Sequence, residues 1–341
     1  MGLVTLASVS PELMQRQLVF AFVSFLVFGV VSQISVQTWW SWGEWLWKGL
    51  LLILLALLIF GRATRGAVAW IDLGWGLRFQ PSQFALLATL CIALPRFSRQ
   101  KMLRDTELAQ LLWLIGAPAI LILLQPDFGT VFLYAAAAST LLLWQKIPWQ
   151  YWRIGLVSVL TFAVIGWNFL LQPYQQARIT GFIAGGQADQ ASTGYNARQA
   201  LIAVGSGQLF GRGLGHGSQS QLRFLPERQT DFIFASLAEE WGLVGSLVVI
   251  ALYAYLIYFL LKPVPHLKDS KQSLFLIVTT VYLLAQTFVN IGMNVGLLPI
   301  TGVTLPLVSY GGSSLLSTMV MLGIAQRIIL QASAQQHLRI A

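Results

Sequence analysis

The sequence predicts an all-α polytopic membrane protein, built as a bundle of transmembrane helices. Only 10% of the 341 residues are charged, whereas a soluble domain uses about 25% charged residues to cover its surface. Hydrophobic residues make up 56% of the chain, and the mean hydropathy is +0.70. The apolar residues come in runs of about 20, the length of a helix that crosses a bilayer, and they lack the alternation of barrel strands. These observations exclude a water-soluble enzyme and a disordered chain.

Nine apolar runs are predicted to span the membrane as helices, because lipid offers no partner to an unpaired backbone. In chain order they cover residues 17–34, 45–60, 82–95, 108–125, 129–145, 152–172, 231–261, 273–296 and 312–332. Residues 1–10 look like the end of another apolar helix, with a short, poorly ordered N-terminus as the alternative. The prediction is therefore nine full spans plus a truncated first span.

The positive charges predict the orientation of these spans. All six lysines and six arginines fall on one side, and the other side carries four arginines when the long segment 173–230 is set aside. Long loops are translocated regardless of charge, so this difference of 12 against 4 is the informative one. It places the lysine-bearing side and the C-terminus in the cytoplasm. Topology and attraction to anionic lipid therefore account for the net charge of +9, without a nucleic-acid partner.

The segment 173–230 is expected to be a folded loop on the outer side. Apolar residues such as Leu201, Val204 and Leu209 predict short helices that pack against the bundle. Five arginines lie in this loop, namely Arg178, Arg198, Arg212, Arg223 and Arg228. They favour an anionic ligand, and phosphate suits the fork of donors on a guanidinium group. The alternative is that these arginines cap loop helices or contact lipid headgroups.

Asp231 lies where the basic loop enters an apolar helix. A carboxylate at a membrane–water boundary can serve as a general base. An equally simple role is helix capping, by Thr230 or by Asp231. Glu239 and Glu240 follow about 12 Å further along the helix axis. They need partners or a wet cavity there, which leaves a buried structural ion pair and a catalytic role both open.

Several other features have simple structural readings. Most of the 13 tryptophans are expected at the membrane interfaces, although Trp70, on the outer side, is also a candidate platform for stacking on a sugar. Asp127 is read as a turn residue. The glycines of 205–215 lack the strand that a nucleotide-binding motif requires, so they indicate tight turns or close backbone approach. A single cysteine, Cys91, and three separated histidines exclude a disulfide framework and a Cys/His metal cluster.

The last outer segment, 298–314, is apolar but interrupted by proline and glycine. Such a segment can re-enter the membrane only where its backbone is buried in protein or lines a cavity. Asn290 and Asn294, one helical turn apart on the preceding span, are expected to help satisfy that backbone.

These motifs resemble those of the SEDS family (RodA, FtsW and SpoVE), membrane glycosyltransferases that polymerise peptidoglycan. The resemblance covers nearly the whole chain and is strongest over 195–245, and the run 219–228 is more similar to RodA than to FtsW. Further matching motifs lie at 65–73, 80–82, 125–127, 290–293 and 306–313. Members of this family have about ten spans with both ends in the cytoplasm, so the resemblance implies a single membrane domain over 1–341 whose first span is truncated, with the C-terminus in the cytoplasm and the loop 173–230 outside.

The resemblance also implies a function. The substrate would be lipid II, a disaccharide pentapeptide on undecaprenyl pyrophosphate, polymerised for cell wall elongation and cell shape at the bacterial plasma membrane beside a class B penicillin-binding protein. Asp231 would be the catalytic residue of a single inverting displacement. The implied substrate-binding residues are Trp70, Arg178, Arg198, Gln199, Arg212, Gln219, Arg223, Arg228 and Thr230. A divalent cation, Mg²⁺ or Mn²⁺, is expected to assist, and no organic cofactor is expected.

Three positions depart from the family pattern. The family usually reads Gln-Pro-Ser-Glu with Lys one turn later, where this chain has Gln83 and Leu86, and Gln229 replaces a usual His. Losing both members of an ion pair leaves no unpaired buried charge, so the fold should tolerate the change. The effect on activity is open, which keeps two alternatives: an impaired homologue acting as a scaffold for a class B penicillin-binding protein, and a flippase for lipid-linked precursor.

Overall fold

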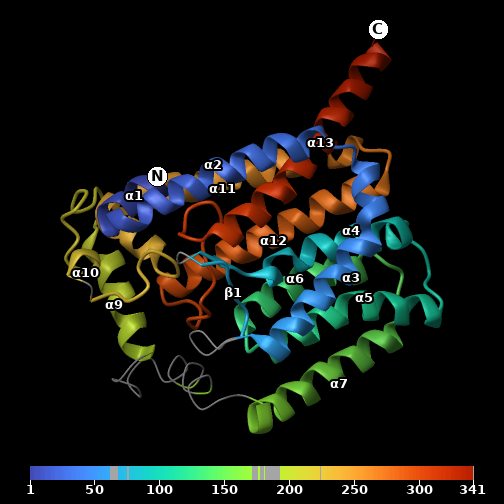
Figure 1. Cartoon of the computed structure of the whole chain (residues 1–341), viewed down its shortest axis with the longest axis horizontal. Helices are drawn as coiled ribbons and strands as arrows, with labels where there is room; N and C mark the ends of the chain where they lie inside the picture. Colours follow the sequence, from blue (N-terminus) through green and yellow to red (C-terminus); the bar gives the residue numbers. More distant parts are fainter. Residues whose placement is uncertain are drawn as a thin grey trace.

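The computed structural model describes residues 1–61, 68–74, 77–170, 176, 180, 193–222 and 224–340. It is mostly helical (Figure 1). The helices up to the long loop are α1 (Gly2–Val9), α2 (Pro11–Gln33), α3 (Val36–Phe60), α4 (Ala85–Phe97), α5 (Asp105–Leu124), α6 (Phe128–Leu143) and α7 (Trp149–Ile165). Those that follow are α9 (Thr193–Ser206), α10 (Ser218–Gln221), α11 (Ile233–Leu261), α12 (Ser270–Asn294) and α13 (Gly312–Ile340). Two short 3₁₀ helices, Pro81–Phe84 and Val264–His266, and a π-helical turn, Gly166–Leu170, complete the helical elements.

The predicted polytopic helical architecture is confirmed. Among the described residues, seven helices are long and apolar enough to cross a membrane, and two shorter apolar helices span Pro81–Phe97 and Phe128–Leu143. Each of the nine predicted segments overlaps one of these helices, although α2 and α3 begin six and nine residues before the predicted starts at 17 and 45. The exact number of spans remains a prediction, because the two shorter helices fall below the length of a full crossing.

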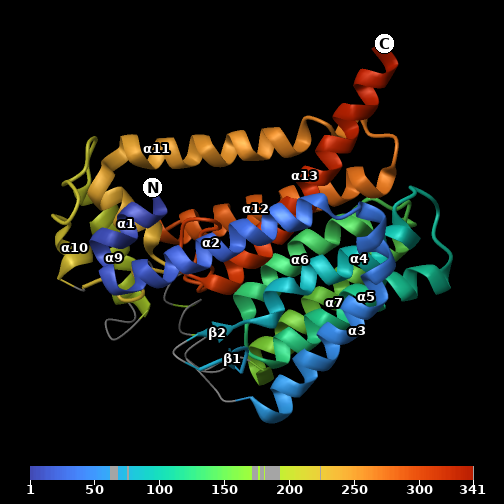
Figure 2. The ribbon, with the colours of Figure 1, turned by 45° about the horizontal axis from the view of Figure 1, so that its top comes forward.

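Helix α4 lies at the centre of the bundle. It packs against α3, α5, α6 and α12 (Figure 1), and nearly all of its side chains are buried. Helix α2 lies along α13, while α7 runs at the edge of the bundle with exposed residues over 153–161 (Figure 2). Exposed apolar side chains on the outer helices are the expected surface for lipid tails. The side chains of the central helix α4, in contrast, are almost all buried in protein.

The two ends of the bundle differ. Helices α9 and α10 lie beside α1 and the start of α11 at one end, and the connections α4–α5 and α11–α12 lie at the other (Figure 1). The predicted packing of short loop helices is confirmed for the described part of the loop. Ala200 and Ala203 of α9 form a buried cluster with Leu225, Phe232 and Ala235, which attaches the loop to the start of α11.

One element departs from the all-α prediction. Strands β1 (Ile71–Asp72) and β2 (Arg78–Phe79) form an antiparallel hairpin. The Asp72 carboxylate accepts a hydrogen bond from the backbone N–H of Gly74 at 2.9 Å, and Gly74 has a φ of +83°. This local Asx turn reverses the chain, and its short-range chemistry explains why a search for long apolar runs missed it.

Candidate functional site

Asp231 is the last polar residue of a turn that precedes α11, and it is half-buried. The backbone carbonyl of Glu227 accepts hydrogen bonds from the N–H groups of Thr230, Asp231 and Phe232, at 3.1, 3.1 and 3.3 Å. Three donors on a single carbonyl close the turn tightly. The backbone of Asp231 is thereby fixed at the entrance to the helix.

Two asparagines of α12 hold the same turn from the bundle side. The Nδ2 groups of Asn290 and Asn294 each donate to the carbonyl oxygen of Asp231 at 3.0 Å. Asn290 Nδ2 also donates to the carbonyl of Val303 at 2.7 Å, as predicted for the segment 298–314. The Oδ1 of Asn294 accepts the backbone N–H of Ala235 at 3.0 Å, so α12 supplies a cap for the first turn of α11.

The segment 298–311 returns across this turn without forming a helix. Tyr310 N–H donates to the carbonyl of Gln229 at 2.9 Å, and Ser309 Oγ donates to the carbonyl of Thr230 at 2.6 Å. Gly302, with a φ of +75°, faces the carboxylate: a Cβ at this position would lie 3.6 Å from Asp231 Oδ2. The backbone of this segment therefore finds its hydrogen-bond partners within the protein, and the segment places a glycine beside the carboxylate of Asp231.

Gln17 of α2 also holds this segment, and sequence analysis missed it. Its side chain is 4% exposed. Its Nε2 donates to the carbonyl of Ser309 at 3.2 Å, and its Oε1 accepts the N–H of Gly311 at 3.1 Å. The available signal was an amide at the start of an apolar run, where a polar group needs a partner.

The glycine-rich run 205–217 docks on a break in α11. Gly242 has φ +68° and ψ −164°, so the helix is interrupted there. The carbonyls of Glu239 and Glu240 accept the N–H groups of Arg212 and Gly213 at 2.9 and 3.1 Å. In return, the N–H groups of Leu243 and Val244 donate to the carbonyls of Gln208 and Leu209 at 2.9 and 3.1 Å. Close backbone approach, predicted from the glycines, is confirmed, and it replaces the hydrogen bonds that the helix loses.

Glu239 and Glu240 are buried at 0% and 2% exposure. Glu239 accepts hydrogen bonds from the N–H groups of Gln219 and Ser220 at 2.8 and 2.9 Å and from Ser220 Oγ at 2.6 Å. Glu240 accepts Ser8 Oγ and, at 3.2 Å, the N–H of Gly215. Among the described residues, N–H and O–H donors thus take the place of the ion pair considered from the sequence. Backbone donors can approach these carboxylates because α10 and the glycine run fold directly onto them.

Six of the nine predicted substrate-binding residues fall into three pairs. Arg212 Nε donates to the carbonyl of Ser206 at 3.1 Å, and Arg228 donates to the carbonyl of Val9 through Nε and Nη2 at 3.3 and 3.0 Å. Both arginines thus bind backbone carbonyls, which is the kind of structural role that the sequence left open as the alternative to ligand binding. Arg212 nevertheless remains exposed. On α9, Arg198 is exposed and Gln199 half-buried. Arg178 and Arg223 lie outside the described residues.

Trp70, Thr230 and Gln219 lie on three separate segments. Trp70 is half-buried directly before β1. The hairpin is attached to α13 because the N–H of Gln80 donates to Ser313 Oγ at 2.9 Å. Thr230 Oγ1 donates within its own turn, to Glu227, and Gln219 is held through its backbone by Glu239. Of the predicted residues that the structure describes, only Arg228, Thr230 and Asp231 are therefore brought together by the same turn.

A chain of hydrogen bonds that runs from Gln83 through Gln80 to Asp127 occupies the place where the family pattern has an ion pair. Gln83 Nε2 donates to Gln80 Oε1 at 3.2 Å, and Gln80 Nε2 donates to Asp127 Oδ2 at 2.7 Å. Asp127 also caps α6 by accepting the N–H of Thr130 at 3.2 Å, as its reading as a turn residue requires. Burial raises the pKa of the Asp127 carboxyl, and the hydrogen bonds to it offset part of that rise. Leu86 is buried in the apolar core.

We predict that Gln83→Glu lowers the free energy of unfolding by about 1–3 kcal/mol, because a carboxylate cannot donate to Gln80 and adds a second acidic group to the hydrogen-bonded chain that ends at Asp127. Adding Leu86→Lys should recover much of the loss, since it supplies a cation one turn away. Thermal unfolding of both single variants and the double variant in one detergent measures the coupling. Strictly additive effects of the two substitutions would contradict this account.

Comparison with known proteins shows related sequences along almost the whole chain. Residues 4–334 match the family of cell cycle proteins described as FtsW, RodA and SpoVE. A relative from Escherichia coli strain K12, named peptidoglycan glycosyltransferase MrdB, is 38% identical over 320 residues, which cover 93% of this chain and 85% of the relative. A relative from Halomonas elongata, named probable peptidoglycan glycosyltransferase FtsW, is 35% identical over 322 residues, which cover 92% and 80%.

Solved structures agree with the fold. A chain of a peptidoglycan synthase complex, described as coordinating polymerization and crosslinking, superposes with a TM-score of 0.82 at 29% identity, covering 97% of this chain and 94% of that chain. The crystal structure of the Thermus thermophilus rod shape determining protein RodA gives a TM-score of 0.70 at 29% identity, covering 96% and 91%.

Proposed function

Because the chain belongs to the FtsW, RodA and SpoVE family of cell cycle proteins, we propose that it is a peptidoglycan glycosyltransferase. It polymerises lipid II into β-1,4-linked glycan strands for cell wall elongation and cell shape. The observation that carries the catalytic assignment is the geometry of Asp231. Its backbone carbonyl is held by Asn290 and Asn294, and Gly302 lies beside its carboxylate.

The proposed reaction is a single inverting displacement. Asp231 accepts the proton of the 4-hydroxyl on the acceptor's N-acetylglucosamine, and that oxygen attacks the anomeric carbon of the donor. The bond from this carbon to the pyrophosphate oxygen breaks, and undecaprenyl pyrophosphate leaves with the electron pair. An α-linked donor thereby becomes a β-1,4 bond. A carboxylate positioned by rigid main-chain contacts meets the geometric requirement for a general base.

Negative charge grows on the leaving group, and arginines are the groups expected to stabilise it. Arg198 and Arg212 are exposed near the start of α11, and Arg223 follows α10 in the chain. Trp70, Gln199 and Gln219 are proposed to contact the sugars and peptide, together with Arg178, Arg228 and Thr230. Arg212 has further N–H groups besides the one that binds the Ser206 carbonyl, so capping α9 does not preclude a ligand contact.

A divalent cation does not fit as a resident group of the described residues. Among them, no group of three or more His, Cys, Asp or Glu side chains lies close enough to hold a metal ion. We therefore place Mg²⁺ or Mn²⁺ with the pyrophosphate of the substrate, whose oxygens are suitable ligands for such ions.

Binding of Mn²⁺ to the purified protein should accordingly depend on lipid II. We expect electron paramagnetic resonance to show free Mn²⁺ in the presence of protein alone and bound Mn²⁺ when lipid II is added. Lipid II in the same detergent without protein is the control. Stoichiometric Mn²⁺ binding by the protein in the absence of lipid II would refute this placement.

The proposed topology follows the predicted orientation. The nine apolar helices cross the bacterial plasma membrane, and α1 lies at the outer end, where Ser8 is close to Gly215 and bound by Gln221 of the loop. The lysine-bearing connections and the C-terminus face the cytoplasm, and residues 1–341 form a single membrane domain. The asymmetry of the lysines supports this orientation.

The test of the function is polymerisation by the purified protein, supplied with lipid II alone and together with a class B penicillin-binding protein. The similar chain in a peptidoglycan synthase complex supports such a partner. We expect glycan strands on a gel in both reactions, with a higher yield in the complex. No polymer in either reaction would favour a scaffold, and movement of lipid II across vesicles without polymer would favour a flippase.

A further inference from the structure

Two adjoining hollows lie on the lipid-facing side of α3, α4 and α5. One, of about 230 Å³, is lined by the polar or charged residues Glu44, Lys48, Arg96 and Gln110 and by four apolar residues, Trp47, Ile92, Trp113 and Leu114. The other, of about 470 Å³, is an apolar groove between α3 and α5, lined by residues such as Leu52, Ala117 and Ile120. Lys48 and Trp113 line both hollows. A hollow that bears charged groups therefore adjoins a wholly apolar groove, apart from Lys48.

The charged compartment carries an excess of one positive charge. Glu44 binds Lys48 Nζ at 2.7 Å and Arg96 Nη2 at 3.8 Å, and Arg96 Nη1 donates to the carbonyl of Ile92 at 3.1 Å. The side chains of Lys48 and Arg96 are 58% and 48% exposed. An ammonium has three donors and a guanidinium five. Both cations therefore keep donors for an anion that approaches from the membrane.

Aromatic residues indicate the depth of this compartment in the bilayer. Trp113 is 62% exposed, and its ring contacts that of Trp47 edge-on at a centroid distance of 6.5 Å. Trp47 Nε1 donates to the carbonyl of Leu114 at 3.1 Å, so this ring is fixed. Exposed tryptophans favour the level of lipid headgroups. At that level, a basic pocket between transmembrane helices suits an anionic headgroup, with an acyl chain continuing into the apolar groove.

We propose that these hollows form a binding site for an anionic glycerophospholipid. The phosphate binds Lys48 and Arg96, and one acyl chain lies in the groove between α3 and α5. The site is at the lysine-bearing end of the bundle, far along the chain from Asp231, and it is independent of the glycosyltransferase chemistry. An ordinary lipid of the surrounding shell would need only the apolar groove, whereas this site adds two cations at its mouth.

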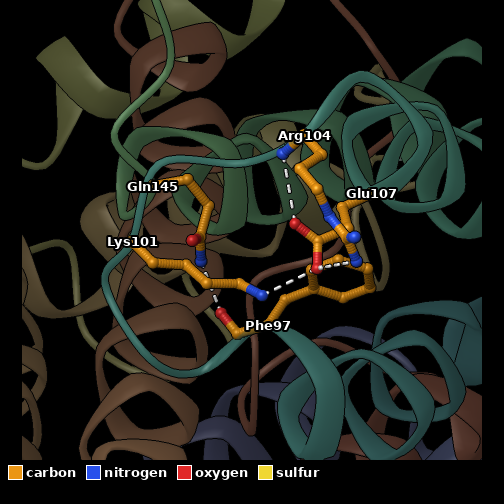
Figure 3. Close-up of polar contacts among 5 residues, drawn as sticks. All are labelled: Phe97, Lys101, Arg104, Glu107 and Gln145. Carbon is orange, nitrogen blue, oxygen red and sulfur yellow. Dashed lines mark hydrogen bonds and ion pairs between the residues drawn. The ribbon is translucent and has the colours of Figure 1, made fainter.

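A second triad of the same composition provides a matched control. Glu107, in the first turn of α5, binds Lys101 Nζ at 2.8 Å and Arg104 Nη2 at 3.4 Å (Figure 3). Both cations lie on the connection between α4 and α5. Lys101, Arg104 and Glu107 line neither of the two hollows. Neutralising the cations of either triad leaves one unpaired glutamate, so the two double variants differ in position but not in charge.

The experiment is native mass spectrometry of the delipidated full chain with phosphatidylglycerol or phosphatidylcholine of identical acyl chains. We expect one phosphatidylglycerol to bind several-fold more tightly than phosphatidylcholine. Lys48→Gln/Arg96→Gln should abolish this preference, a loss of roughly fivefold for each cation, while Lys101→Gln/Arg104→Gln should retain it. Glu44→Gln should strengthen phosphatidylglycerol binding, because it frees both cations, whereas a merely structural triad predicts only a lower Tm.

The remaining outcomes each overturn the proposal. Equal binding of the two lipids would show an ordinary lipid contact, and equal losses in both double variants would show a diffuse surface charge. Glycerophosphoglycerol, the headgroup without acyl chains, is the third probe. It should fail to displace bound phosphatidylglycerol at equal concentration, and full displacement would mean an anion site that does not use the groove.

Discussion

Asp231→Asn is expected to reduce the rate of glycan polymerisation by about 10²–10⁴-fold, the usual contribution of a general base. Asparagine has nearly the same shape, and the contacts that fix this residue are made by its backbone. The N–H bond to Glu227 and the carbonyl bonds from Asn290 and Asn294 should therefore persist. The expected result is an inactive protein with an unchanged fold, measured as polymer formed from lipid II and as Tm in the same detergent.

Glu227→Gln is the matched control for this prediction. Glu227 lies in the same turn and contributes its main-chain carbonyl to the fold, which the substitution keeps. We expect this variant to retain most of the activity, because losing a carboxylate elsewhere in the turn removes no proton acceptor from the reaction. Equal polymer yields from Asp231→Asn and the unmodified protein would remove Asp231 from the mechanism.

The sequence predicted the helices because their signal is local. A run of about 20 apolar residues allows few alternatives in lipid, and each of the nine predicted runs overlaps a helix. The roles of Asn290 and of the glycine run could be anticipated for a related reason. Each is a polar or flexible residue in a context where the backbone must find a partner.

The contacts that build the site from distant segments could not be predicted. Gln17 meets Ser309 across 292 positions of the chain, and Ser8 meets Glu240 across 232. No periodicity connects such pairs. The break at Gly242 was equally hidden, because one glycine in an apolar run is also compatible with a continuous helix. An ion pair was one of the two roles left open for Glu239 and Glu240, but backbone N–H groups can satisfy a buried carboxylate as well, and sequence patterns do not display them.

The break in α11 at Gly242 divides the helix into a short first part, which directly follows the turn bearing Asp231, and a long second part. Four backbone hydrogen bonds from the glycine run cross this break, and a Cβ on Gly211 would lie 2.1 Å from the carbonyl oxygen of Glu240. Gly213 has a similar backbone, with φ of +91° against +83°, but a Cβ there would meet only His216 Nδ1 at 3.6 Å. The two glycines share the conformational constraint and differ in the space around them.

We therefore expect Gly211→Ala and Gly213→Ala to diverge sharply. Each substitution places a side chain in the left-handed region of φ and ψ, which lowers the free energy of unfolding by about 1–2 kcal/mol. Gly211→Ala should cost about 1–3 kcal/mol more, because the added methyl overpacks the joint, and it should lose polymerisation because the turn bearing Asp231 is no longer held in place. Tm and polymer yield of the two variants measured side by side provide the comparison. If Gly213→Ala proved as unstable and inactive as Gly211→Ala, backbone strain alone would explain the glycines, and docking of this run on the helix break would have no part in positioning the catalytic turn.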